Sequence, residues 1–175
     1  TTLPSSVATI GEYAFSGTDA TVKISFDSLT IGNDITSIGY GAFKYCSIGT
    51  LNLTSTATTY RSDIFSNTNI TNLNIGNTVT KISDSMFEYS SGFTSLTIPN
   101  SVTTIEYTGF RRCYDLKTLT INGNTTIGSY GFSSCSSLSS VTMPNVTEIG
   151  SSAFYSCSSL KKINASSTYD AVINL

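Results

Sequence analysis

The chain has 175 residues, enough for one domain with a sizeable core. It carries 9 Lys or Arg against 11 Asp or Glu, no His and no Trp, and its pI is near 4.9. Because nucleic-acid binding needs clustered basic charge, we expect no nucleic-acid partner. No run of about 18 apolar residues occurs, so the sequence predicts no membrane insertion.

The polarity of the chain comes from hydroxyl groups more than from charges. Charged residues make up 11% of the sequence, against about 25% in an ordinary globular domain, while roughly a third of the chain is Ser or Thr. Such a composition is also typical of disordered or mucin-like segments. Here 39% of the residues are hydrophobic and they recur in register, so the sequence predicts a folded repeat.

An internal repeat of about 22 residues runs through the chain, and each copy contains one phenylalanine at a fixed place. These repeat phenylalanines are Phe15, Phe43, Phe65, Phe87, Phe110, Phe132 and Phe154, with separations of 28, 22, 22, 23, 22 and 22 residues. Five residues before them lie Ile10, Ile38, Tyr60, Ile82, Ile105, Ile127 and Ile149. This register predicts about seven structural repeats.

Each copy predicts the same elements in the same order. An apolar pair with one residue between, such as Leu119 and Ile121, predicts a short strand with both side chains on one face. A turn dipeptide such as Asn122-Gly123 follows, and then a second short extended piece such as 102–105. A stretch such as 150–154 is too short for a stable α-helix and predicts a helical turn or 3₁₀ segment.

One such unit is one coil of the chain, and a single coil cannot bury its own apolar face. We therefore expect a solenoid of stacked coils, mainly short parallel strands joined by turns, with the phenylalanines as the spine of its core. The extra residues at 19–26 are expected to form a loop that bulges from one coil. The stretches from Phe43 to Leu51 and from Phe65 to Leu73 are each one residue shorter than in later copies.

Residues 1–175 are interpreted as a single repeat domain. Leu3 matches Ile98 in the repeat, which indicates a first strand cut off part way, and 171–175 are predicted to be extended after the last coil. Neither end shows the polar cap that solenoids need, and no signal peptide is visible in residues 1–10. We expect the sequence to be an excerpt of a longer chain.

The four cysteines, Cys46, Cys113, Cys135 and Cys157, each follow a repeat phenylalanine by three residues. They are predicted to stack as a column of buried structural thiols. A disulfide is an alternative, because stacked Cα atoms lie about 5 Å apart, but parallel inward side chains rarely meet the required torsion. Metal binding is the weaker alternative, because zinc prefers ligands that converge in a tetrahedron and the chain offers no His.

No residues form a catalytic pattern. Without histidine, a Ser or Cys nucleophile lacks its commonest general base. The acidic pairs Asp84 with Glu88 and Asp115 with Glu106 fall at solvated positions of the repeat, which disfavours a glycosidase-type site. The glycine-rich phosphate-binding motifs G-x-x-x-x-G-K and G-x-G-x-x-G do not occur. The sequence therefore predicts no enzyme activity, no catalytic residue, no cofactor and no metal.

Two surfaces are candidates for ligand binding. The strand face that points away from the core carries a central column of Thr30, Asn52, Asn74, Thr97, Thr120, Thr142 and Asn164, flanked by Ser28, Thr50, Asn72, Ser95, Thr118, Ser140 and Lys162. This column is either the solvated side of a sheet or a regular hydrogen-bonding surface for a protein loop or glycan. Tyrosines near the phenylalanines are either partner anchors or covers for neighbouring coils, and Arg111 and Arg112 are interpreted as solvated charges.

The recurring motif I-G-x-x-A-F-x-x-C-x-x-L, present at 149–160, resembles the BspA-like, or treponemal-type, leucine-rich repeats over essentially the whole chain. The resemblance implies a right-handed leucine-rich-repeat solenoid. It also implies a non-catalytic adhesion module of a cell-surface or secreted protein, which recognises host matrix protein, another cell or a glycan. The alternatives are a purely structural spacer and an accessory binding module in a larger multidomain or phage-type surface assembly.

Overall fold

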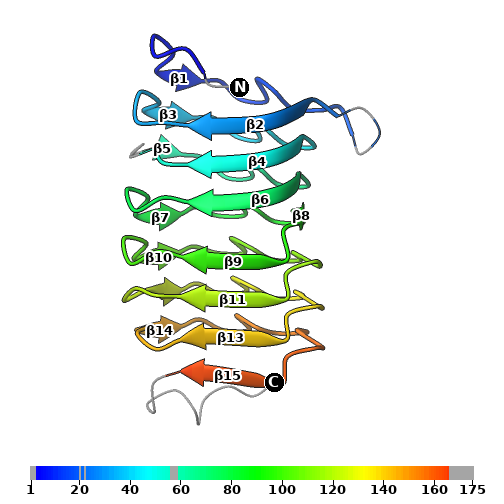
Figure 1. The fold of residues 1–175 in the computed structure, drawn as a ribbon, viewed down its shortest axis with the longest axis vertical. Coiled ribbons are helices and arrows are strands. Elements are labelled where there is room, and N and C mark those ends of the chain that lie inside the picture. Colours follow the sequence, from blue (N-terminus) through cyan, green and yellow to red (C-terminus); the bar gives the residue numbers. More distant parts are fainter. Residues whose placement is uncertain (1–2, 20, 22, 56–58, 166–175) are drawn as a thin grey trace.

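The long strands of the repeat stack in parallel along one side of the molecule (Figure 1). The computed structural model describes residues 3–19, 21, 23–55 and 59–165. Within them the long strands are β2 (Ser25–Ile31), β4 (Ser47–Leu53), β6 (Asn69–Ile75), β9 (Ser95–Ile98), β11 (Thr118–Ile121), β13 (Ser140–Met143) and β15 (Lys162–Ala165). Most of their apolar pairs are buried, as in β11, where Leu119 and Ile121 are 1% and 0% exposed. The predicted solenoid of parallel strands is confirmed.

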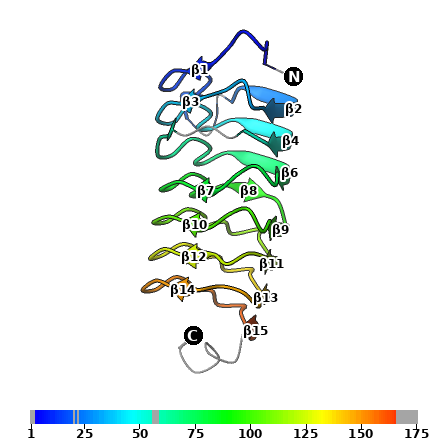
Figure 2. The same ribbon diagram turned by 90° about the vertical axis from the view of Figure 1, so that its left-hand side faces the viewer.

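Short strands form a second stack on another side of each coil (Figure 2). They are β1 (Thr9–Ile10), β3 (Ser37–Ile38), β5 (Thr59–Tyr60), β7 (Lys81–Ile82), β10 (Thr104–Ile105), β12 (Thr126–Ile127) and β14 (Glu148–Ile149). They pair in the register of the repeat, so that Ile105 lies beside both Ile82 and Ile127. A further short strand, β8 (Ser91–Gly92), pairs with β6.

The third side of each coil is a run of turns around the repeat phenylalanine. We call this segment the turn arc and define it from three residues before that phenylalanine to four after it, as in 107–114. The described residues contain no helix, and therefore none long and apolar enough to cross a membrane. This differs from the predicted helical turn because residues two before and two after the phenylalanine have positive φ, as at Ser85 (51°) and Tyr89 (58°). A left-handed residue at these places ends each turn before a helix continues.

Backbone hydrogen bonds join successive turn arcs in a ladder. The N–H groups two before, at and two after each phenylalanine donate to carbonyls of the next coil. From the fourth coil to the fifth, the donors Ser85, Phe87 and Tyr89 reach Tyr107, Gly109 and Arg111 at 3.0, 2.9 and 2.9 Å. The same three bonds recur at each step from the first described coil to the last. They satisfy buried backbone groups that no strand pairs.

The repeat phenylalanines form the predicted spine of the core. From Phe15 to Phe154, successive ring centroids lie 5.1 to 5.6 Å apart, with planes within 13° of parallel. The five rings from Phe43 to Phe132 are fully buried. Their spacing follows from the separation of about 4.8 Å between neighbouring strands. Each aromatic pair adds about 0.5 to 1.5 kcal/mol to the stabilisation from burial.

The sheet of long strands is divided between β6 and β9. Strands β2, β4, β6 and β8 form one sheet, and β9, β11, β13 and β15 form another. The cause is a difference in length: the stretch from Phe87 to Leu96 is one residue longer than the corresponding stretches of the two preceding copies. The backbone accommodates this extra residue at Gly92. This glycine has a φ of +97°, and a Cβ on it would lie 2.7 Å from the carbonyl oxygen of Ile70. The register of the first sheet therefore does not continue into the second.

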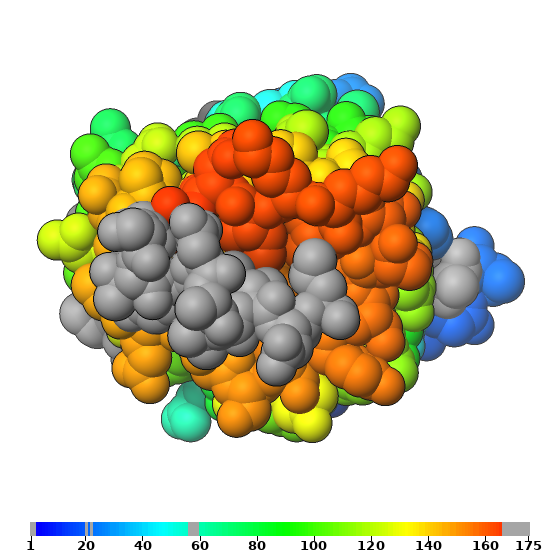
Figure 3. All heavy atoms as spheres, turned by 90° about the horizontal axis from the view of Figure 1, so that it is seen from below, coloured from blue at the N-terminus to red at the C-terminus, as the bar shows by residue number. Residues whose placement is uncertain are grey.

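The loop expected at 19–26 ends earlier than predicted, because β2 begins at Ser25. Its described part, residues 16–19, 21 and 23–24, leaves the side of the stack, and Figure 3 shows it as the blue atoms at the right. Phe26 belongs to β2 instead, because it pairs with Ile48 and its ring meets Phe15 and Phe43 edge to edge at 6.1 and 6.2 Å. Leu3 lies outside any strand. The extended segment predicted at 171–175 lies outside the described residues.

Removing one phenylalanine ring from the stacked core should destabilise the protein strongly. We expect Phe87→Ala or Phe110→Ala to lower the free energy of unfolding by about 3 to 5 kcal/mol, because each leaves a cavity between two stacked rings. A urea titration measures this loss. Tyr155→Ala is the control, since its ring is 66% exposed and the change should stay within about 0.5 kcal/mol. A loss below about 1 kcal/mol at both phenylalanines would contradict the spine.

Candidate functional site

The cysteines are buried, free thiols that bond to phenylalanine carbonyls. The Sγ atoms of Cys46, Cys113, Cys135 and Cys157 donate to the carbonyl oxygens of Phe15, Phe87, Phe110 and Phe132, one coil earlier, at 3.1 to 3.3 Å. In the third and fourth copies, which lack this cysteine, the hydroxyls of Thr68 and Ser90 donate to Phe43 and Phe65 at 2.8 and 2.7 Å. The position therefore requires a small side chain with a hydrogen-bond donor, and a thiol is one way to meet that requirement.

The surroundings of Cys46, Cys135 and Cys157 keep these three thiols protonated. Burial raises the pKa of Cys46 to about 12. The pKa of Cys157 is raised first by the neighbouring Cys135 thiol and then by burial, and that of Cys135 is raised chiefly by the Cys113 thiol. Because the thiolate is the form that attacks or binds metal, these three thiols are unreactive at neutral pH. No cluster of potential metal ligands occurs in the part of the chain that the structure describes.

The open face, meaning the side of the long strands turned away from the core, carries the predicted column in register. Residues Thr30, Asn52 and Asn74 pair within the first sheet, and Thr97, Thr120, Thr142 and Asn164 pair within the second. Both groups alternate with buried apolar residues along their strands. The seven predicted residues therefore form two columns, which the break between β6 and β9 separates.

On the open face of the first sheet, polar side chains form hydrogen bonds with one another. Asn74 donates from Nδ2 to Oδ1 of Asn52 at 2.8 Å, and Asn52 donates from Nδ2 to Oγ1 of Thr30 at 3.4 Å. In the flanking column, Nδ2 of Asn72 reaches Oγ1 of Thr50 at 3.5 Å. Such amide ladders support the sheet. They also leave fewer free polar groups for a ligand.

On the open face of the second sheet, the threonine side chains do not bond to one another. The hydroxyls of Thr97, Thr120 and Thr142 have no side-chain partner among residues 3–19, 21, 23–55 and 59–165, and Thr97 is exposed while the other two are half-buried. Each hydroxyl offers one donor and two acceptor sites. This half of the open face therefore presents regularly spaced polar groups that are free to bond outward.

A hollow of about 250 Å³, which we call the break hollow, opens between the two sheets. It is lined by Thr71, Asn72, Leu73, Asn74, Thr94 and Ser95. Beyond Ile70, β6 has no paired strand in the next coil. Leu73 is accordingly 8% exposed, whereas its register partner Leu51 is 0% exposed. Sequence reasoning missed this hollow, although the one-residue difference in repeat length signalled it.

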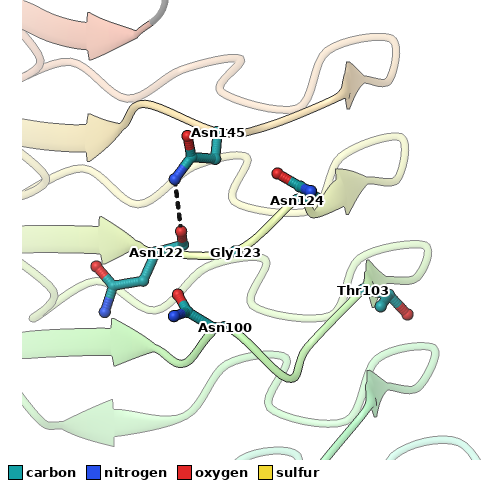
Figure 4. Close-up of a pocket in the computed structure, with 6 residues that line it drawn as sticks. All are labelled: Asn100, Thr103, Asn122, Gly123, Asn124 and Asn145. Atoms are coloured by element: carbon teal, nitrogen blue, oxygen red, sulfur yellow. Dashed lines mark hydrogen bonds between the residues drawn. The ribbon is translucent and has the colours of Figure 1, made fainter.

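A larger hollow of about 400 Å³, the asparagine hollow, lies where β9, β11 and β13 end (Figure 4). Its lining is Asn100, Thr103, Asn122, Gly123, Asn124 and Asn145. Nδ2 of Asn145 donates to the carbonyl oxygen of Asn122 at 2.9 Å. The side-chain amides of Asn100, Asn122 and Asn124 have no partner within the described residues. Sequence reasoning treated Asn122 only as a turn residue and missed the hollow.

The tyrosines support both of their predicted roles. The rings of Tyr107 and Tyr130, from neighbouring coils, meet edge to edge with centroids 5.9 Å apart. They nevertheless remain 52% and 36% exposed. Tyrosine therefore covers the adjoining coil and also leaves aromatic surface open to a partner.

Parallel strands stacked by a repeat of 22 to 23 residues, with leucine, isoleucine and phenylalanine columns inside, define a leucine-rich-repeat solenoid. The chain belongs to the family described as the BspA type leucine-rich repeat region. The model of that family matches six copies, over residues 19–126 and 116–174. Members are generally modules for protein interaction. The resemblance seen in the motif at 149–160 is therefore confirmed.

Two solved structures of bacterial leucine-rich repeat proteins share the fold. The protein from Bacteroides ovatus has a TM-score of 0.53 and 22% identity, with 95% of this chain and 55% of that one covered. The protein from Eubacterium ventriosum has a TM-score of 0.60 and 20% identity, with 94% and 59% covered. This chain thus spans less than two thirds of either structure. A comparison with curated proteins finds no match.

The buried thiols predict a loss of stability at alkaline pH. The folded chain keeps Cys46 protonated up to a pKa of about 12, whereas an unfolded thiol ionises above about pH 8.5. The stabilisation is therefore complete below about pH 8.5 and is lost as the pH rises toward the folded pKa. Between pH 8 and pH 10, the free energy of unfolding should fall by about 1 to 2 kcal/mol more in the native chain than in Cys46→Ser.

Urea titrations of both chains across that pH range measure the difference. Serine is the suitable replacement because Ser90 makes the corresponding hydrogen bond in its own coil. The ionisation of Tyr and Lys is common to the two chains and cancels in the comparison. Parallel stability profiles for the two chains would rule out a protonated thiol at position 46.

Proposed function

We propose that the chain is a non-catalytic binding module of a cell-surface or secreted protein, and that it recognises a protein or glycan on a host or neighbouring cell. The open face of the second sheet, with the two hollows at its margins, is the binding site. The observation that carries this proposal is the column of free hydroxyls at Thr97, Thr120 and Thr142. A regular array of donors and acceptors suits a ligand with repeated polar groups, such as an extended peptide or a sugar chain.

The hollows extend this array at two margins. The break hollow borders β9 through Thr94 and Ser95, and the asparagine hollow begins where β9 and β11 end. A ligand that crosses these two strands would reach both. The volumes of about 250 and about 400 Å³ lie at or below the small end of small-molecule sites, roughly 300 to 1,000 Å³. Each hollow therefore suits one side chain or one sugar unit of a larger ligand.

The chemistry of the lining favours a neutral polar ligand. Apart from Leu73 in the break hollow, both hollows are lined by amides, hydroxyls and backbone, with no charged residue among the lining side chains. An amide offers a donor pair and an acceptor together, which matches either a peptide group or adjacent sugar hydroxyls. The surface location is supported by the family, whose members are typically surface-associated.

Arginine substitutions on the open face should abolish most of the binding. A glycan array and a panel of immobilised extracellular-matrix proteins serve as probes, and the affinity for each positive probe is then measured. We expect Asn74→Arg and Thr120→Arg each to weaken binding by about tenfold or more, which corresponds to about 1.4 kcal/mol. The long charged side chain would fill the space above the strand and oppose a neutral ligand.

Thr80→Arg is the matched control, because Thr80 is exposed and precedes the short strand β7, away from the open face. It should leave binding unchanged. Undiminished binding by both Asn74→Arg and Thr120→Arg would move the site to another surface. The absence of binding to every probe by the native chain would instead favour the structural spacer.

A further inference from the structure

Exposed aromatic rings gather on the turn arcs. Of the seven large hydrophobic side chains that are exposed in the described residues, six are tyrosines of these arcs: Tyr13, Tyr89, Tyr107, Tyr114, Tyr130 and Tyr155. Four of them come from three successive coils in the middle of the chain. With two adjacent arginines they make up the tyrosine–arginine surface, defined as Tyr89, Tyr107, Tyr114, Tyr130, Arg111 and Arg112.

Ring and cation contacts connect the members of this surface. The rings of Tyr89 and Tyr114 meet edge to edge with centroids 6.4 Å apart. The guanidinium of Arg112 lies over the Tyr89 ring, 4.8 Å from its centroid, and that of Arg111 lies 6.0 Å from the Tyr130 ring. Stacking on an aromatic ring orders an otherwise flexible arginine. The surface is thus arranged before any partner binds, which lowers the entropic cost of binding.

The fold does not require large side chains at these positions. Tyr89, Arg112 and Tyr130 have φ values of 58°, 60° and 58°, a conformation that costs a residue with a side chain about 1 to 2 kcal/mol. Corresponding places in other coils hold small residues such as Gly41, Asn67 and Ser134. Because small residues form the same arc, the fold does not need tyrosine or arginine here, and their side chains add exposed surface.

The two arginines differ in how their charge is balanced. Nη1 of Arg111 pairs with Oε1 of Glu88 at 3.3 Å. Arg112 has no carboxylate partner within the described residues. The neighbouring carboxylate of Asp115 is occupied, because its Oδ2 accepts the backbone N–H of Gly92 at 2.9 Å. Arg112 therefore presents an unpaired guanidinium whose forked donors match a carboxylate.

We infer that the tyrosine–arginine surface docks an acidic segment of a protein partner. A carboxylate of the segment bonds to the guanidinium of Arg112, and an apolar side chain next to it lies on the rings of Tyr89 and Tyr114. Tyrosine and arginine are the residue types that contribute most to protein–protein binding energy. This surface occupies a different side of the coil from the open face, so it is a second site, independent of the proposed function.

The local charges favour one carboxylate over a polyanion. Asp84, Glu88, Glu106 and Asp115 lie in or beside the same arcs. They would repel a sulfated or uronic-acid glycan, which needs clustered cations. A neutral glycan would stack on the rings but would leave Arg112 without a partner. A short protein segment with a single carboxylate beside apolar residues fits both features.

A displayed library of random linear peptides, selected on the whole chain, tests this inference. The selected peptides should share an Asp or Glu beside an apolar residue. One such peptide, synthesised, should bind the native chain about tenfold or more tightly than Arg112→Ser, since a charged pair is lost. Replacing its Glu by Gln should cost a similar factor with the native chain and nothing further with Arg112→Ser, as expected for two groups in direct contact.

The variants are chosen to keep the fold. Ser134 and Ser156 occupy the place of Arg112 in later coils with φ of 58°, and Asn67 occupies that of Tyr89 with φ of 55°. Tyr89→Asn should also weaken binding, whereas the controls Tyr155→Ser and Thr120→Arg should not. The inference is wrong if the selected peptides lack a carboxylate, if none depends on Arg112, or if Thr120→Arg alone weakens them. If the native chain binds heparin and Arg112→Ser does not, the ligand of this surface is a polyanionic glycan and not an acidic protein segment.

Discussion

The ladder between turn arcs is the interaction on which the rest of the solenoid depends. The stack of short strands is interrupted between the third and fourth coils, where β5 does not pair with β7, and the stack of long strands between the fourth and fifth, where β6 does not pair with β9. Across the first of these steps, Asp63, Phe65 and Asn67 still donate to the next coil at 3.2, 2.9 and 2.9 Å. The ladder therefore holds the phenylalanine rings in stack, with centroids 5.4 Å apart at this step. The left-handed residues make this possible by directing alternate N–H groups along the solenoid axis.

The same ladder explains the cysteines. In five copies the phenylalanine carbonyl lies at a turn, where it accepts the backbone N–H three residues later, as Phe110 does from Cys113. Its second lone pair faces the next coil and is satisfied there by the thiol of Cys135. A buried carbonyl left half satisfied would cost stability, so the next coil must supply a small donor. Chemistry that needs a thiolate is suppressed by this role, and interaction with other molecules is left to the surface.

Periodicity alone predicted the strands, the phenylalanine spine and the in-register columns of the open face, because alternation along a strand determines which side chains share a face. The turn arc was predicted as helical because its left-handed positions hold residues such as Ser85 and Tyr89, which carry no signature of that conformation. The break hollow was missed because it depends on where one extra residue is absorbed, here at Gly92. The free state of the Thr120 hydroxyl and the stacking of Arg112 on Tyr89 depend on side-chain contacts between coils, which spacing does not encode.

Departures from the repeat create the two hollows and the tyrosine–arginine surface, in addition to the free threonine hydroxyls of the regular second sheet. In the first sheet the regular pattern lets side chains bond to their counterparts in the neighbouring coil, as Asn74 does with Asn52, and little remains for a ligand. Where it changes, at Gly92, at the asparagine turns and at Arg112, polar groups stay unpaired. The arc ladder tolerates such changes because its bonds use only backbone atoms, so exposed side chains can vary with little loss of stability. A solenoid held together in this way can therefore acquire binding surfaces one coil at a time.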